Sequence, residues 1–467
     1  MDIYKAFCNK LESYSRICPC VIFFVLSALL PRTAYSQSIV RYATSVEGID
    51  ADRIAVYIEG LRTGEVILDV NGEEPMVPAS ITKLFTSATV FRTSDLDSRY
   101  ATEILTTGKL DKNVLKGNIV IKASGDPTIG SSAFSECASL PDSIVAAVRR
   151  QGIEKIEGRI IIDSPKWLRQ GVPAGWTDSD VNHPYGTGHH SFNYADNRFS
   201  LRFSRDGSYA LSPANPSVEI KKSSRKSDET VWRKRDDDIY NVFYNKKTPL
   251  IVDLANPSPE NSFLCVLENM FDSCGIVLEN KKIKKSSNEH IIYTHYSPTV
   301  YDILHSLVLR SDNMMAEAML RYAFPGRKRE DAVEDEISLW CSLGVDTRDI
   351  KIEDGSGLSR NNRITAYAMA DMLAWMCDND DNFVRFLNLL PKAGISGTLR
   401  SFLKDTPLQG RLWAKTGSLN GVQCYAGYAV DAVGVPTHIV VIMVNGFKGS
   451  RADVKSVLQN LLIEKLL

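Results

Sequence analysis

Hydrophobic and polar positions alternate over residues 53–70, which is the pattern of a β-hairpin with one buried face. The polar turn Arg62-Thr63-Gly64 separates the two predicted strands. The stretch from Pro78 to Phe85 then predicts the start of a helix, with the proline just outside it. We therefore expect a hairpin followed by a helix near the N-terminal end of the folded chain.

The pattern becomes helical again from about residue 298, where apolar residues recur three and four positions apart. This stripe consists of Val300, Ile303, Leu304, Leu307 and Val308. Two apolar runs, 422–430 and 438–444, predict strands, and the chain ends in a predicted helix. The apolar face of that helix is formed by Val454, Val457, Leu458, Leu461 and Leu462. We expect this face to pack on the protein core rather than on a membrane.

Residues 91–290 differ from both ends, because their short strand-like runs are interrupted by many Gly, Pro, Asn and Asp residues. Examples are the apolar runs 119–122 and 159–163. The polar segment 221–247 carries a dense mixture of charges. We interpret it as a solvated loop, with a binding role as the alternative.

The N-terminal residues have the pattern of a secretory signal peptide. A mildly positive stretch precedes the apolar run 17–30, whose 14 residues fit a signal peptide. A membrane-spanning helix needs about 20. Small residues at Ala34 and Ser36 predict cleavage after Ser36, which would remove residues 1–36, and an uncleaved anchor is the alternative. We expect a mature chain without a transmembrane segment, because no other long apolar run follows.

Composition places the rest of the chain among folded proteins. Of its 467 residues 44% are hydrophobic, and the net charge is only −1, which excludes disorder for most of it. Basic residues (55) and acidic residues (56) balance, which argues against nucleic acid as a partner. The predicted fold class is α+β. One domain, residues 37–90 and 291–467, is split by a β-rich insertion, residues 91–290.

Cysteine and histidine positions give little support for a disulfide framework or a metal site. No Cys-x-x-Cys pair occurs after the predicted signal peptide. Cys265 and Cys274 could close a small loop, or they could be buried free thiols. The clustered His183, His189 and His190 lack the spacing of metal ligands. We expect neither a metal nor another cofactor.

Ser80-Ile81-Thr82-Lys83 is a Ser-x-x-Lys sequence at the predicted helix start. Positions three apart share a helix face, so the Lys83 ammonium could approach the Ser80 hydroxyl. A serine is a weak nucleophile until a neighbouring base takes its proton. A lysine can be that base when burial or another cation lowers its pKa. Alone this pattern is weak, because residues 223–226 and 401–404 also match it.

Two more short motifs could supply chemistry. Ser311-Asp312-Asn313 falls between two helical patterns, where a hydroxyl could relay a proton and an amide could hold a substrate. A helix cap is the alternative. Lys415-Thr416-Gly417-Ser418 follows a predicted strand and would offer a cation, hydroxyls and a backbone N–H to an anionic group. The alternative is a strand that ends in a turn. Gly417 would let a ligand approach the backbone closely.

Together the three motifs resemble the ordered set found in penicillin-binding proteins and class A β-lactamases. The long interval between Ser80 and Ser311 resembles one group of these. This is the D-alanyl-D-alanine carboxypeptidase/endopeptidase family, low-molecular-mass penicillin-binding proteins with a large insertion at that point. Other segments that resemble it are 124–128, 185–186, 354–360 and 394–399. The resemblance covers most of residues 40–467 and implies a serine β-lactamase/transpeptidase-like domain, an antiparallel sheet flanked by helices.

The resemblance implies a catalytic role for five residues. Ser80 would be the acylated nucleophile and Lys83 its base. Ser311 would pass the proton to the leaving amine, and Asn313 would bind the backbone amide of the substrate. Lys415 would polarise Ser311 and help to attract the substrate carboxylate. Two nearby lysines would repel a second proton, which would depress the pKa of one of them, and which lysine acts as the base stays open.

The resemblance also implies substrate contacts. Thr416 and Ser418 would hold the terminal carboxylate, next to Gly417, and the backbone N–H groups of the nucleophile and Ser418 would form the oxyanion hole. Asp163 and Arg360 match positions that resemble a pocket for the zwitterionic tip of a diaminopimelate side chain. Asp163 as a turn residue and Arg360 in a structural ion pair are the alternatives.

The implied substrate is a peptidoglycan stem peptide that ends in D-Ala-D-Ala, and β-lactam antibiotics would be covalent inhibitors. The same site could also cleave D-Ala–diaminopimelate cross-links. A β-lactamase is one alternative, but the Glu-x-x-Leu-Asn of the class A enzymes is missing, and Val384 stands at its first position in the nearest match. A non-catalytic peptidoglycan-binding protein is another alternative. An exported enzyme of this kind is expected in the periplasm.

Overall fold

The computed structural model describes residues 50–134, 140–165, 171–224, 227–283 and 288–467. The predicted signal peptide, residues 1–36, lies outside the described residues, as does Cys137. Among the helices that the structure describes, none is long and apolar enough to cross a membrane.

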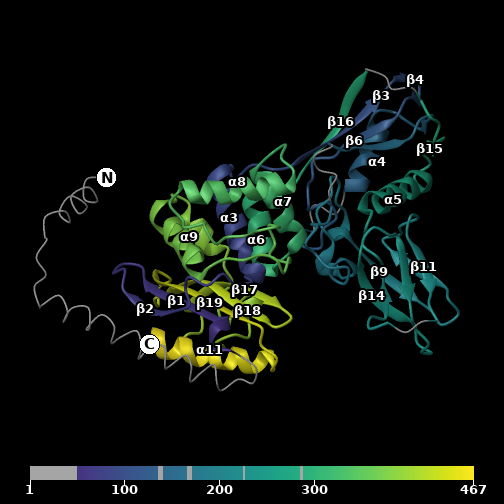
Figure 1. The fold of residues 1–467 in the computed structure, drawn as a ribbon. Coiled ribbons are helices and arrows are strands. Elements are labelled where there is room, and N and C mark those ends of the chain that lie inside the picture. Colours follow the sequence, from purple (N-terminus) through teal and green to yellow (C-terminus); the bar gives the residue numbers. More distant parts are fainter. Residues whose placement is uncertain (1–49, 135–139, 166–170, 225–226, 284–287) are drawn as a thin grey trace, which may run out of the picture.

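The two ends of the described chain meet in one antiparallel sheet (Figure 1). Its strand order is β17-β18-β19-β1-β2. Ile54 lies opposite Val444 and Gly60 opposite His438, so the predicted N-terminal hairpin pairs along its full first strand with the C-terminal strands. The strands are β1 (Ile54–Gly60), β2 (Val66–Val70), β17 (Leu412–Leu419), β18 (Val422–Val430) and β19 (Pro436–Asn445).

This sheet is buried on both faces. Along β19, Val440 and Ile442 belong to one hydrophobic cluster, whereas Val441 and Met443 belong to another, because successive side chains of a strand point to opposite faces. The first cluster includes the apolar stripe of α11 (Arg451–Leu466). The predicted packing of that stripe on the core is therefore confirmed (Figure 1).

A layer of helices covers the other face of the sheet (Figure 1). Its members are α3 (Thr82–Thr93), α6 (Val300–Arg310), α7 (Asn313–Ala323), α8 (Arg329–Ser342), α9 (Ala366–Asn379) and α10 (Phe383–Asn388). All five residues of the stripe predicted from residue 300 are buried in α6. Side-chain caps start α6 and α7: Thr299 accepts from Asp302 N, and Asp312 accepts from Met315 N. Ser311 and Asp312 thus lie between α6 and α7.

The middle of the chain builds a second part of the molecule, the inserted lobe, which comprises the described residues of 101–296 (Figure 1). Its first two sheets have the orders β16-β3-β6-β8 and β15-β7-β5-β4, and two others have the orders β10-β9-β14 and β11-β13-β12. The first two contain β3 (Ala101–Thr107), β4 (Lys109–Asp111), β5 (Val114–Lys116), β6 (Ile119–Lys122), β7 (Lys155–Ile156), β8 (Ile160–Asp163), β15 (Val277–Leu278) and β16 (Glu289–Tyr296).

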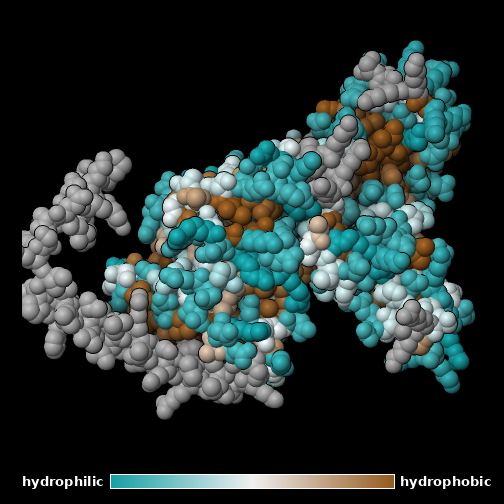
Figure 2. Space-filling model, viewed as in Figure 1, coloured by the Kyte–Doolittle hydropathy of each residue, from teal (hydrophilic) through white to brown (hydrophobic). Residues whose placement is uncertain are grey.

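The other two sheets and two helices complete the inserted lobe. The strands are β9 (Arg198–Phe203), β10 (Tyr209–Ser212), β11 (Glu219–Lys222), β12 (Val231–Trp232), β13 (Ile239–Val242) and β14 (Leu250–Ala255). Helices α4 (Leu140–Arg150) and α5 (Pro259–Ser273) pack their apolar residues against the strands of β3 and β6. On the face seen in Figure 2, hydrophobic residues also gather where the sheet of β3 and β6 lies.

The insertion begins and ends later in the chain than the sequence predicts, because α3 continues to Thr93 and the first strand of the lobe starts at Ala101. Strand β16 pairs with β3 from Glu289 opposite Thr107 to Tyr296 opposite Ala101, so its residues belong to the inserted lobe. The expected boundary at residue 290 is therefore too early. The chain returns to the helical layer after Tyr296, where Thr299 caps the start of α6.

The interpretation of 221–247 as a solvated loop is wrong for its middle part. The Arg233 side chain is only 4% exposed. It donates to Tyr240 Oη at 3.0 Å and to the carbonyl oxygens of Val181 at 2.9 Å and Arg235 at 2.6 Å. A guanidinium offers several donors in a rigid fork, so it can join segments that lack regular pairing. Charge density in the sequence does not distinguish such a buried anchor from a solvated side chain.

We predict that Arg233→Ala destabilises the inserted lobe by about 2–4 kcal/mol, because the carbonyls it satisfies lose their donor and a cavity remains. Thermal denaturation and limited proteolysis of the inserted lobe would measure the loss. Lys234→Ala is the matched control, because the Lys234 side chain is exposed. Equal stability of the two variants would contradict the assignment of Arg233 as an anchor.

Candidate active site

Ser80 lies in a short 3-10 turn, η2 (Ala79–Ile81), that leads directly into α3. The predicted helix therefore begins at Thr82, two residues after the serine. The spacing still brings the two motif residues together, since Lys83 Nζ donates to Ser80 Oγ at 3.0 Å. Ser80 is partly exposed, whereas Lys83 is fully buried. The partly exposed Ser80 hydroxyl thus contacts the buried Lys83 amine.

Lys83 is held by acceptors from three separate segments. Besides Ser80, its Nζ donates to Asn313 Oδ1 at 2.6 Å and to the Ser356 carbonyl at 2.6 Å. Burial lowers the pKa of Lys83 to about 8, although the negative charges of Asp354, Asp312 and Glu317 act in the opposite direction. At pH 7 roughly a tenth of Lys83 is therefore neutral, and the neutral amine is the form that can accept a proton.

Ser311 and Lys415 form a second hydroxyl–amine pair. Lys415 Nζ donates to Ser311 Oγ at 2.8 Å and to the Thr416 carbonyl at 2.8 Å. Burial, followed by the charge of Lys83, holds the pKa of Lys415 well below its ordinary value. Ser311 itself adopts a left-handed conformation with φ 60°, which turns the chain between α6 and α7. The charge of Lys83 thus acts on the pKa of Lys415 in the expected direction.

Gly417 brings strand β17 against η2, the turn that contains the expected nucleophile Ser80 and is called the nucleophile turn below. A Cβ at Gly417 would lie 2.5 Å from the Pro78 carbonyl oxygen and 3.1 Å from Ser80 N, so only glycine fits without a shift. Strand β17 is an edge of the sheet. In the described part of the chain its outer side pairs with residues 391–393 up to Ala414. The edge from Lys415 onward thus runs beside Ser80.

The other predicted substrate residues lie at two places. Thr416 and Ser418 both lie on β17. Thr416 Oγ1 donates to Thr398 Oγ1 at 2.8 Å, and Ser418 Oγ donates to Gln423 Oε1 at 3.0 Å. Arg360 is exposed and donates to the carbonyl of Asn420, just past the end of this strand, at 3.3 Å.

Asp163 lies elsewhere, at the end of β8 in the inserted lobe. Its Oδ2 pairs with Lys122 Nζ at 2.7 Å beside a cavity of about 190 Å³ that Ile161 and Ile283 also line. None of the motif residues lines this cavity. A diaminopimelate pocket shared by Asp163 and Arg360 therefore stays a prediction.

The inserted lobe touches the motif residues directly. Asn313 Nδ2 donates to the Tyr185 carbonyl at 2.9 Å, and Arg198 Nη2 pairs with Asp312 Oδ2 at 3.4 Å. The Tyr185 ring stacks on His183, and burial with the nearby Asp180 raises the pKa of Tyr185 to about 12. These contacts hold the amide of Asn313 between Lys83 and the inserted lobe.

Sequence reasoning did not assign a role to Glu317 or Ser356. Glu317 Oε1 accepts from Ser356 N at 3.0 Å, and its Oε2 accepts from Arg329 Nε at 3.1 Å. Burial raises the pKa of Glu317 to about 7. The position of Glu317 four residues after Asn313, on the same face of one helix, is the signal that could have found it.

The cysteines and histidines that the structure describes serve packing and loops. Cys265 and Cys274 are free thiols rather than a disulfide, but both are only partly buried and not fully buried as expected. His189 Nε2 bonds the Gly125 carbonyl at 2.6 Å, and burial holds the pKa of His189 well below its ordinary value. His190 Nε2 bonds the Thr187 carbonyl at 3.3 Å. Both rings are therefore neutral, and each bonds a backbone carbonyl.

A serine hydroxyl on a buried lysine, a second serine–lysine pair, and an edge strand beside both define an SxxK serine hydrolase. Comparison with known proteins gives the same class. The D-Ala-D-Ala carboxypeptidase 3 (S13) family matches residues 35–462, and the chain belongs to this family. The resemblance inferred from the motifs is thereby confirmed, and the chain is a serine-type D-Ala-D-Ala carboxypeptidase.

Relatives match along most of their length. The D-alanyl-D-alanine carboxypeptidase DacB of Haemophilus influenzae is 24% identical over 431 residues, which are 87% of this chain and 88% of the relative. The carboxypeptidase DacB of Mycolicibacterium smegmatis is 25% identical over 408 residues, 84% of this chain and 76% of the relative. The crystal structure of penicillin binding protein 4 from H. influenzae has a TM-score of 0.77 at 22% identity and covers 91% of this chain and 98% of its own. The expected α+β, transpeptidase-like fold is confirmed.

We predict that Gly417→Ala slows acylation by a β-lactam at least tenfold, because the new methyl group must push β17 away from the nucleophile turn. Stopped-flow acylation measures the rate. Gly152→Ala is a suitable control, since a Cβ there meets no atom within 4 Å, although φ is +70°. It adds backbone strain without touching the site. A Gly417→Ala enzyme that acylates at the wild-type rate would contradict the steric argument.

Proposed function

We propose that this carboxypeptidase removes the terminal D-Ala from peptidoglycan stem peptides through an acyl-enzyme at Ser80. The observation that carries the proposal is the hydrogen-bonded cluster of Ser80, Lys83 and Asn313, with the Ser311–Lys415 pair beside the same edge strand. Three motifs far apart in the sequence supply these groups. Acyl transfer to a serine requires a hydroxyl beside a proton acceptor, and Ser80 with Lys83 supplies both.

In the acylation step, Ser80 Oγ attacks the carbonyl carbon of the penultimate D-Ala. Neutral Lys83, 3.0 Å from that oxygen, takes the hydroxyl proton as the new C–O bond forms. Gly417 packs against η2 next to Ser80 N. The backbone N–H groups of Ser80 and of Ser418, the residue after Gly417, would stabilise the oxyanion there. The free N–H of the nucleophile follows from its place at a helix start.

Collapse of the oxyanion breaks the C–N bond to the terminal D-Ala. Ser311, polarised by Lys415 at 2.8 Å, passes its proton to the departing amine, and the proton that Lys83 took from Ser80 replaces it, so that Lys83 is neutral again. Water then attacks the ester carbonyl while Lys83 takes one of its protons; the C–O bond to Ser80 breaks, and that proton returns to Ser80 Oγ as the shortened stem peptide leaves. A site of this type also accepts D-Ala–diaminopimelate bonds, and we propose endopeptidase activity as a second outcome of the same chemistry.

The edge of β17 supports the choice of substrate. An extended peptide can add to a free sheet edge through main-chain hydrogen bonds, and the edge from Lys415 to Leu419 ends beside Ser80. Thr416 and Ser418 then face the terminal carboxylate, and Lys415 supplies positive charge. We assign Arg360, at the end of this edge, to the distal part of the stem peptide.

A cell-envelope location completes the proposal. Residues 1–36 carry the pattern of a signal peptide, and the proposed substrate lies outside the inner membrane. The solved H. influenzae relative has also been crystallised with a β-lactam. We therefore propose that the chain is exported to the periplasm and that β-lactams acylate Ser80. N-terminal sequencing of the secreted protein would locate the cleavage site.

We expect benzylpenicillin to form a one-to-one adduct with the purified protein, visible in its intact mass, and Ser80→Ala to form none. Persistence of the adduct over minutes to hours, with D-Ala release from a stem pentapeptide, supports the carboxypeptidase. Rapid loss of the adduct with drug turnover would instead indicate a β-lactamase. The nearest match to the class A Glu-x-x-Leu-Asn sequence has Val384 in place of the glutamate, and the loss of that deacylating group favours a persistent adduct. Val384 lies on α10 and is 68% exposed.

Absence of any adduct on the wild-type protein would overturn the nucleophile assignment. The remaining interpretation would then be a peptidoglycan-binding protein without catalysis. Binding of the pentapeptide by calorimetry distinguishes this outcome from an unfolded preparation, because a binding protein still releases heat while no D-Ala appears.

We also predict that the acylation rate rises with pH and reaches half its maximum near pH 8, the pKa of Lys83. The sign follows from the role: the neutral amine accepts the serine proton, so each pH unit below about 8 lowers the rate roughly tenfold. Stopped-flow acylation between about pH 6 and pH 9 measures the profile. A flat profile across this range would contradict Lys83 as the proton acceptor.

A further inference from the structure

A buried tryptophan of the inserted lobe contacts the turn that holds Lys83. Trp176 is 2% exposed, and its indole Nε1 donates to Asp354 Oδ2 at 2.7 Å. Its ring packs with Val181 of the inserted lobe and with Leu358 of the turn. The contact is therefore both polar and apolar, and it joins two segments that lie far apart in the sequence.

Asp354 organises that turn, residues 354–359, by accepting from its backbone. Its Oδ1 accepts from Gly357 N at 2.7 Å, and its Oδ2 accepts from Ser359 N at 2.7 Å. Asn362 Nδ2 adds a bond of 2.8 Å. Trp176 supplies the donor from outside the turn, so loss of its N–H leaves a fully buried carboxylate with one partner fewer.

The turn reaches the nucleophile in two ways. The Ser356 carbonyl accepts from Lys83 Nζ at 2.6 Å, while Ser356 N donates to Glu317. Gly357 packs against the nucleophile turn so closely that a Cβ there would lie 1.9 Å from the Ala79 carbonyl oxygen. A shift of this turn therefore moves one of the three acceptors of Lys83 and the backbone beside Ser80.

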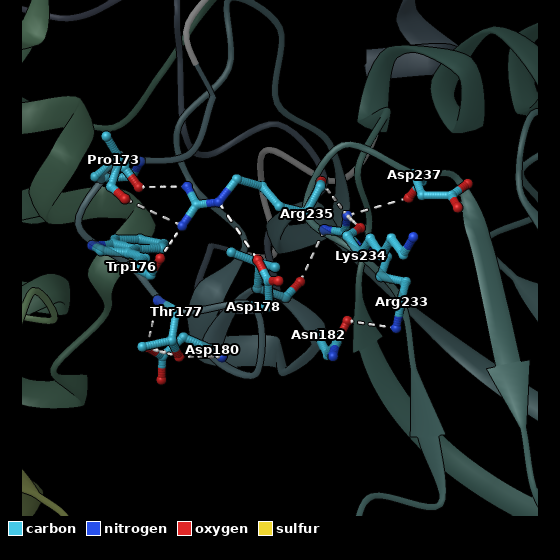
Figure 3. Close-up of polar contacts among 12 residues, drawn as sticks. Pro173, Trp176, Thr177, Asp178, Asp180, Asn182, Arg233, Lys234, Arg235 and Asp237 are labelled. Carbon is cyan, nitrogen blue, oxygen red and sulfur yellow. Dashed lines mark hydrogen bonds and ion pairs between the residues drawn. The ribbon is translucent and has the colours of Figure 1, made fainter. Parts of the chain in front are cut away.

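Arg235, in the charge-dense segment of the inserted lobe, fixes the segment that carries Trp176 (Figure 3). Its Nη1 donates to the Pro173 carbonyl at 2.8 Å, and its Nη2 donates to the carbonyls of Ala174, at 3.3 Å, and of Trp176. Nε lies 3.9 Å from Asp178 Oδ1. One guanidinium thus spans the backbone on both sides of Gly175, which a more flexible lysine cannot do.

We propose that Trp176 and Arg235 are positioning residues of the active site: through Asp354 and Ser356, the inserted lobe holds the Lys83 amine in place against Ser80. The proposal rests on the proposed function, since it assumes that Ser80 is acylated. The inserted lobe then acts as part of the catalytic machinery, although neither residue touches the substrate.

The first test uses Trp176→Phe, which keeps an aromatic ring and removes the indole donor, and Arg235→Ala. We expect each to lower the β-lactam acylation rate about tenfold, the scale of one hydrogen bond to a charged group. We also expect the acid limb of the pH profile to move to lower pH. The turn carries the Asp354 charge and the Ser356 carbonyl, and both stabilise the Lys83 ammonium. Arg235→Lys should recover only part of the rate.

The double variant, Trp176→Phe with Arg235→Ala, tests whether the two residues act through one chain of contacts or independently. If Arg235 acts through Trp176, the double variant acylates about as fast as Trp176→Phe alone. The matched controls are Trp232→Phe in β12 and Arg202→Ala in β9, the same changes elsewhere in the inserted lobe. Both controls should keep the wild-type rate and profile. Wild-type behaviour of Trp176→Phe, or additive losses in the double variant, would overturn the proposal.

Hydrogen exchange keeps the proposal testable even if the proposed function fails. In the wild-type protein the amides of Gly357 and Ser359 are bonded to Asp354 and should exchange slowly. We expect the peptide that spans residues 353–360 to exchange faster in Trp176→Phe and Arg235→Ala, but not in the two controls. Unchanged exchange overturns the inference, whereas absence of a penicillin adduct on the wild-type protein overturns only the proposed function.

Discussion

The buried amine of Lys83 is the group on which the rest of this structure depends. An ammonium removed from water needs a full set of acceptors, and here they are a serine hydroxyl, an asparagine amide and a backbone carbonyl. These acceptors come from η2, from α7 and from the turn at residues 354–359. Lys83 can therefore be buried in this way only when distant parts of the chain have assembled, which links formation of the base to formation of the fold.

The close approach of β17 to η2 is a second constraint on the site. Strand β17 runs so close to η2 that a side chain at Gly417 would collide with Pro78. The same strand places Lys415 against Ser311 and, among the described residues, forms an edge of the sheet. Because β18 and β19 are buried between two layers, β17 cannot move without disturbing both cores. Packing of the sheet thus holds β17 beside Ser80, and the turn at residues 354–359 adds a polar contact to Lys83.

The inserted lobe belongs to the site as much as to its own sheets. It contacts Asn313 through the Tyr185 carbonyl, Asp312 through Arg198, and Asp354 through Trp176. The first two contacts reach the motif that begins at Ser311, and the third reaches the turn whose Ser356 carbonyl accepts from Lys83. An insertion of this length between the first two motifs would otherwise be a burden on folding, because it lengthens the loop that must close. Its contacts offset part of that cost and fix the groups around Lys83.

The family, the central hairpin, the helical stripe after residue 300 and the motif residues could be predicted from the sequence, because each rests on a pattern of spacing or side-chain chemistry. The partners that surround them depend on the tertiary structure. No local pattern shows that Ser356 and Glu317 support Lys83, that Arg233 is buried within a charged segment, or that Asp163 lies on a sheet of the inserted lobe. These are contacts between distant segments, and their partners are set by the packing of whole layers, which no single stretch of sequence encodes.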